Sequence, residues 1–292
     1  QDDAGASGTS YFNGAPTSSV VNLGNNSGSN QSGQPCLLYC WSEVSGYSKF
    51  GTYTGDGTST KKITTGFKPR FLLVKPTSAT GNWNIFDSER PANTQPITYS
   101  LQPNLDSAEY QSEPGITFND DGFTLNSVNT SGTTYIYIAF ADRPGNNWDV
   151  NNLVTNEGLT TSKTQFDVAL WTGDGSSSQS ISSLSFQPDL VWLKGRSYSI
   201  SHLLYDSVRG FGADKELVPN GTNAEGAAGA DSTYGYVSAV SSTGFTVQGG
   251  SSANDGYTNK SSATYVAWCW KAGGTAVSNT DGSITSSVSA NP

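Results

Sequence analysis

The feature that most constrains this chain is a long internal repeat. The segment that opens at Tyr53-Thr54-Gly55-Asp56-Gly57 recurs 118 residues later, at Trp171-Thr172-Gly173-Asp174-Gly175. The matched segments lie at 53–57 and 171–175, 67–75 and 186–194, 85–90 and 204–209, 101–104 and 217–220, 122–125 and 244–247, and 135–140 and 265–270. A chain that repeats itself over this length is built from tandem units of one fold, each packing mainly against its neighbours.

The closing segment of the repeat occurs a third time, as Cys36-Leu37-Leu38-Tyr39-Cys40-Trp41, but no opening segment precedes it. Residues 1–44 are therefore predicted to be the C-terminal half of an incomplete repeat. Either preceding chain or strands from a neighbouring subunit would complete it, because half a sandwich leaves a strand edge unpaired. The remaining divisions are listed in order: repeat 1 at 45–142, a linker at 143–164, repeat 2 at 165–272, and a linker or exchanged strand at 273–292.

The composition indicates an all-β fold. Gly accounts for 33 of the 292 residues and only 13% are charged, while helical periodicity is missing almost throughout. The runs Phe71 to Val74 and Leu190 to Leu193 are continuously apolar, which is typical of strands buried on both faces. We predict tandem antiparallel β-sandwich repeats of jelly-roll type.

Charge and cysteine spacing exclude several classes of partner. The net charge of −9 disfavours nucleic acid, and no apolar run approaches the roughly 20 residues that would insert into a membrane. Cys36 and Cys40 would lie about 13 Å apart in a strand, too far for a disulfide. Cys40 aligns with Cys269 and with Ala139, which predicts small, packed core positions. His202 and these cysteines lack zinc-ligand spacing, so no metal or cofactor is expected.

The acidic residues predict structure rather than catalysis. Asp87 precedes Arg90 at the same spacing as Asp206 precedes Arg209, which favours a hydrogen-bonded turn over a functional charge pair. Each Gly-Asp-Gly turn offers one carboxylate, whereas calcium needs about 6 to 8 oxygen ligands. This disfavours calcium binding but leaves it open as an alternative. The glutamates are unmatched between the copies, and no nucleophile elbow accompanies the histidine. The sequence therefore predicts no enzyme activity.

Aromatic residues in polar loops are the candidate binding residues. Trp83, Trp148, Tyr198 and Tyr257 lie in segments rich in Gly, Asn and Ser, outside the apolar runs. Exposed aromatic faces can stack on sugar rings, so these four are predicted to bind carbohydrate. The alternative is that each one packs against a neighbouring repeat or subunit.

Three segments, 42–57, 137–144 and 265–274, resemble the tandem β-modules in virion proteins of aquatic tailed bacteriophages. The resemblance implies a non-enzymatic, extracellular virion protein in a tail fibre or a capsid-surface decoration, adhesive to host surface glycans. Its partners would be other copies of itself and other virion proteins, arranged as a symmetric oligomer. The alternative is a secreted or cell-surface lectin-like module or a subunit of an extracellular filament.

Overall fold

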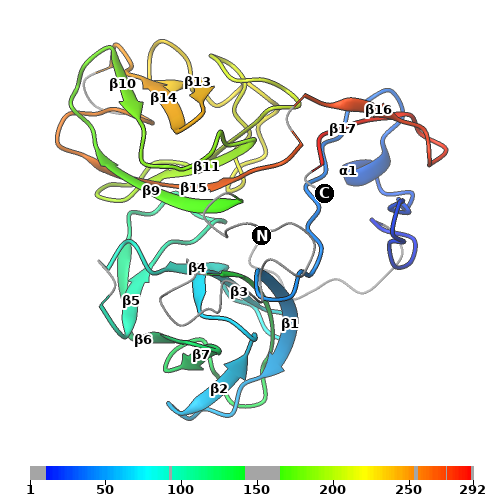
Figure 1. Cartoon of the computed structure of the whole chain (residues 1–292), viewed down its shortest axis with the longest axis vertical. Helices are drawn as coiled ribbons and strands as arrows, with labels where there is room; N and C mark the ends of the chain where they lie inside the picture. The colour runs from blue at the N-terminus through cyan, green and yellow to red at the C-terminus, as the bar shows by residue number, and fades with distance from the viewer. Residues whose placement is uncertain (1–10, 92–93, 142–164, 253–255, 274, 291–292) are drawn as a thin grey trace, which may run out of the picture.

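Two antiparallel β-sandwiches make up most of the molecule (Figure 1). The computed structural model describes residues 11–91, 94–141, 165–252, 256–273 and 275–290. The predicted all-β sandwich fold is confirmed: within these residues the one helix is α1 (Ser27–Asn30). None of the described helices is long and apolar enough to cross a membrane.

Repeat 1 folds into two four-stranded sheets. We call the sheet that faces repeat 2 its inner sheet, in the order β1 (Ser48–Thr54), β8 (Thr134–Ala141), β3 (Pro69–Pro76), β4 (Asn84–Asp87). Its outer sheet has the order β2 (Lys61–Thr64), β7 (Gly122–Leu125), β6 (Tyr110–Asn119), β5 (Ile97–Ser100). The core between the sheets includes Leu72, Phe86 and Phe123.

Repeat 2 has the same arrangement with one outer strand fewer in the described residues. Its inner sheet has the order β12 (Leu203–Asp206), β11 (Leu190–Gly195), β15 (Thr264–Trp270), β9 (Phe166–Thr172). Its outer sheet has the order β10 (Ser178–Ile181), β14 (Gly244–Gln248), β13 (Tyr236–Ser241). Each closing segment, β8 or β15, is thus a central strand of an inner sheet.

The continuous apolar runs become central strands because both of their faces are covered. Every residue of β3 is buried, as the run from Phe71 to Val74 predicts. Leu72 and Val74 point into the core of repeat 1, whereas Phe71 and Leu73 belong to a separate cluster shared with repeat 2. The inner sheets therefore bury one face inside their own repeat and the other face against the neighbouring repeat.

The half-repeat and the tail lie beside the two sandwiches (Figure 1). Strand β16 (Val277–Asn279) pairs with β17 (Ser286–Val288), so the tail forms a hairpin of its own. All three cysteines are free thiols, so the prediction that Cys36 and Cys40 do not pair with each other is confirmed. Cys269 is buried as expected, but the core prediction is wrong for Cys40, which is exposed. Residues 36–41 form no strand, because none of the described strands is hydrogen-bonded to them, and Cys40 is left uncovered.

Candidate binding site at the interface of the repeats

The two inner sheets meet in an aromatic cluster. Its buried members are Phe71, Leu73, Ile85, Leu101 and Phe140 from repeat 1, and Phe166, Val168, Leu190, Val266, Trp268 and Trp270 from repeat 2. The ring of Phe71 lies 5.9 Å from that of Trp268 and 5.8 Å from that of Phe166. Both contacts are edge-to-face, an arrangement that aromatic quadrupoles favour.

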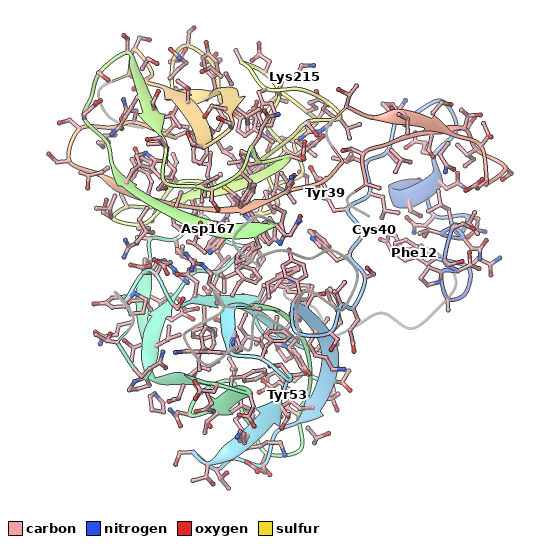
Figure 2. The ribbon with its side chains drawn as sticks, viewed as in Figure 1. Phe12, Tyr39, Cys40, Tyr53, Asp167 and Lys215 are labelled. Carbon is pink, nitrogen blue, oxygen red and sulfur yellow. The ribbon has the colours of Figure 1, made fainter. Side chains whose placement is uncertain are left out.

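One buried ion pair crosses the interface beside this cluster. Nη2 of Arg70 donates to Oδ1 of Asp167 at 2.5 Å, and both side chains are almost fully buried. Glu89 lies 3.2 Å from the same Nη2. Figure 2 places Asp167 on the side of repeat 2 that faces repeat 1. A buried charge is costly without its partner, so this pair favours the one packing arrangement of the two sheets that brings both charges together.

A second polar contact crosses the interface through Asp87. Its Oδ1 accepts from the backbone N–H of Arg90, and its Oδ2 accepts from Nε of Arg90 at 2.6 Å. This confirms the predicted turn. The same Oδ2 accepts from the indole Nε1 of Trp268 in repeat 2 at 3.0 Å. Glu109 links Arg90 to Arg196 of repeat 2, at 3.0 and 2.8 Å.

The equivalent aspartate of repeat 2 receives a contact from the half-repeat. Oδ1 of Asp206 accepts from the backbone N–H of Arg209, and Oδ2 accepts from Nε of Arg209 at 2.7 Å. Tyr39 donates its hydroxyl to Oδ2 of Asp206 at 2.8 Å. Burial, together with the charge of Asp206, raises the pKa of Tyr39 well above its usual value, so the phenol stays protonated as a donor.

A small open pocket lies where the repeats meet. It has a volume of about 190 Å³, and its lining is mostly apolar: Leu73, Trp83, Pro103, Asn104, Trp192 and Pro219. Leu73 aligns with Trp192, and Pro103 aligns with Pro219, so both repeats contribute equivalent residues. Oδ1 of Asn104 accepts from the backbone N–H of Trp83 at 3.1 Å and holds that loop in place.

A buried histidine fixes the second tryptophan of the pocket. Nε1 of Trp192 donates to Nδ1 of His202 at 3.0 Å, and Nε2 of His202 then donates to the carbonyl of Gln102 at 3.1 Å. Burial lowers the pKa of His202 well below its usual value, and the charge of Lys194 lowers it further. The imidazole is therefore neutral, and it joins the two repeats as a structural hydrogen bonder.

The structure separates the four predicted binding residues. Trp83 lines the pocket, and Trp148 lies outside the described residues. Tyr198 donates to the carbonyl of Gly256, lies 2.9 Å from the hydroxyl of Tyr265, and has Lys260 5.0 Å above its ring. Tyr257 donates to the carbonyl of Ala228 at 3.0 Å and packs against the core of repeat 2.

Sequence reasoning found one of the six pocket residues, Trp83, and missed the other five, among them the second tryptophan, Trp192. It lies in an apolar run, and such runs indicate core strands. The signal lay in the alternation of that strand, because Val191 and Leu193 face the core of repeat 2 and Trp192 must face the other way. The described residues contain no group of three His, Cys, Asp or Glu side chains that could hold a metal ion.

A family model described as "Domain of unknown function (DUF7483)" matches residues 1–144 and 161–292. No curated protein and no solved structure matches the chain.

Proposed function

We propose a role for this chain, which belongs to the DUF7483 family of domains of unknown function, from its own architecture. It serves as a non-enzymatic structural protein of a virion, in a tail fibre or a capsid-surface decoration, and it adheres to host surface glycans. The alternative is that the chain is a secreted or cell-surface lectin-like module, or a subunit of an extracellular filament, with the same binding site.

The structural part of the proposal is supported by the contacts of the buried charged groups. Asp87, Glu109 and Asp167, three buried or nearly buried carboxylates at the interface, are held by arginines that join one repeat to the other or close a turn. A chain whose buried charged groups hold neighbouring sandwiches in one fixed arrangement is suited to a rigid structural part of a larger assembly.

The adhesive part rests on one observation: two tryptophans line the pocket between the repeats. Tryptophan and proline surfaces bind the apolar faces of sugar rings, and the pocket is too small for more than a ring or a chain end. Many weak pockets on a repetitive assembly would add up to firm attachment through avidity.

Two experiments test the proposal. Immunogold electron microscopy with an antibody to residues 165–272 is expected to label phage tails or capsids; label on host cells or filaments with bare virions would move the protein to the alternative placement. A glycan array is expected to give a signal that Trp83→Ala abolishes. Tyr99→Ala, which removes an exposed ring on β5, is the matched control and should leave that signal unchanged.

A further inference from the structure

The half-repeat contacts repeat 2 in the same way as repeat 2 contacts repeat 1. Tyr39 occupies the position of Trp268 in the closing segment, and Asp206 occupies the position of Asp87. Tyr39 donates to Asp206 at 2.8 Å, and Trp268 donates to Asp87 at 3.0 Å. Two successive contacts that use the same pair of positions describe one head-to-tail interface, repeated by a single rotation.

Three equivalent rings show that this rotation closes on itself. Trp41, Phe140 and Trp270 end the three closing segments. Their centroids lie 6.3 Å apart for Trp41 and Phe140, 5.9 Å for Trp41 and Trp270, and 5.5 Å for Phe140 and Trp270. Three equivalent residues that all touch one another surround a threefold axis, so the interface generates a ring of three places.

Repeats 1 and 2 fill two of these places, and residues 36–41 mark the third. In β15, Tyr265, Ala267 and Cys269 face the core of their own repeat, while Val266, Trp268 and Trp270 face the neighbour. Residues 36–41 keep the same alternation. Tyr39 is half-buried and Trp41, although 40% exposed, contacts Phe140 and Trp270, whereas Leu38, at the position of Ala267, is 48% exposed, and Cys36 and Cys40 are exposed as well.

Among the described residues, the backbone of residues 36–41 also lacks the partners of a central strand. Both edges of β15 are paired, one with β11 and the other with β9. Within the part of the chain that is described, no backbone group of residues 36–41 is hydrogen-bonded to another backbone group. An extended apolar segment with bare edges and one bare face can complete a sandwich.

Charges at the interface indicate what the third place accepts. Arg70 of repeat 1 pairs with Asp167 of the next repeat around the ring. The same two positions carry Asp189 in repeat 2 and Lys49 in repeat 1, so the signs are reversed. Lys49 is paired with Glu43 at 2.5 Å, whereas Asp189 is 5% exposed and its Oδ1 has no hydrogen-bond partner in the described structure, although its Oδ2 accepts from the backbone N–H of Ala272. The unit in the third place should therefore bring a cation to Asp189 and no second cation to Lys49.

We propose that the third place is filled by a module of this same fold that lacks its own last strand, with residues 36–41 serving as that strand. The module carries Lys or Arg at the position of Lys49, and a neutral or acidic residue at the position of Arg70, because a cation there would face Lys49. It pairs with both edges of residues 36–41, covers Cys36, Leu38 and Cys40, and closes a ring of three sandwiches around the aromatic axis.

The test extends the full chain at its N-terminus with a second copy of residues 45–130, which is repeat 1 without β8. One version carries Arg70→Glu in the added copy, and the matched version keeps Arg70. Labelling of Cys40 with a thiol reagent should slow by more than roughly tenfold in the Arg70→Glu version relative to the unextended chain, because a covered thiol reacts only on local opening. The slowing should be smaller when Arg70 is kept. Equal labelling rates in all three chains would refute the proposal.

The unextended chain supplies an independent test. Leu38→Asp should leave its melting temperature unchanged, because Leu38 faces solvent there, and should restore fast labelling of Cys40 in the extended chain. A large fall in the melting temperature of the unextended Leu38→Asp chain would show that the face is already covered. Dimers of the unextended chain in light scattering, with Cys40 protected, would assign the third place to a second copy instead. Either of these two results overturns the proposal.

Discussion

Lys194 shows how far a single side chain can be perturbed in this fold. It is fully buried on β11, and its Nζ donates to the carbonyl of Gly195 at 2.7 Å. Lys75 at the same position of repeat 1 donates to the carbonyl of Pro76 at 2.8 Å. Burial lowers the pKa of Lys194 to about 7, although the charges of Asp106 and Glu109 partly oppose this.

This pKa predicts a dependence of stability on pH. Between pH 7 and the usual pKa of lysine, the unfolded chain holds a proton at Lys194 that the folded chain has released. The free energy of unfolding should therefore rise with pH in that window, by at most roughly 1.4 kcal/mol per pH unit. Urea titrations from pH 7 to 9.5 measure the rise. Lys194→Met should remove that contribution, and Lys271→Met, on an exposed lysine, should retain it; equal slopes in both variants would contradict the assignment.

At the scale of the element, the Gly-Asp-Gly turns are fixed by an asparagine far along the chain. Nδ2 of Asn259 donates to Oδ1 of Asp174 at 2.9 Å, and Nδ2 of Asn129 donates to Oδ1 of Asp56 at 2.8 Å. Hydrogen bonds from Thr58 and Asn129 lower the pKa of Asp56 to about 2. The first glycine is needed because the turn lies directly against the segment that carries the asparagine.

Gly173→Ala should destabilise repeat 2 for that reason. A Cβ at this position would lie 2.2 Å from the carbonyl oxygen of Lys260, so the backbone must shift. We expect a loss of about 1–3 kcal/mol in the free energy of unfolding, measured by urea denaturation. Gly282→Ala is the matched control, because its Cβ meets nothing closer than 3.6 Å. A loss no larger than that of the control would show that the turn gives way freely.

The sequence predicted the elements that depend on local pattern. The apolar runs became β3 and β11, and both Asp–Arg pairs closed turns. It failed at residues 36–41, where an apolar segment that matches β15 forms no strand. A strand needs hydrogen-bond partners as well as a pattern, and the pattern alone does not say whether those partners are at hand.

At the scale of the whole molecule, the side chains between the repeats are buried as completely as those in the core of a single domain. Trp268 is fully buried, donates to Asp87 across the interface, and has the guanidinium of Arg90 5.7 Å from its ring. The repeats can be aligned from the sequence alone, but the sequence did not predict that the two inner sheets pack against each other. The alternation of side chains shows that an inner strand is apolar on both faces, although only one face packs in the core of its own repeat. Which surface covers the other face is seen only in the structure.

Calorimetry should therefore find that the two repeats unfold together. We expect one transition for the native chain, and two separate transitions for Trp268→Ala, which removes about 3–5 kcal/mol of packing at the interface. Trp171→Ala, inside the core of repeat 2, should lower the single transition without splitting it. A native chain that already shows two transitions would mean that the interface does not couple the repeats.

The reversed charges at the interface bear on how such a chain avoids misfolding. Tandem domains of one ancestry are prone to exchange strands with the wrong neighbour while they fold, because each offers the same complementary surface. Arg70 meets Asp167, whereas the same position in repeat 2 is Asp189. A repeat that docks on a second copy of itself would bring two like charges together, Arg70 against Lys49 or Asp189 against Asp167. The charges at these positions thus distinguish one sandwich from the other, and gene duplication can lengthen the chain without making its domains interchangeable.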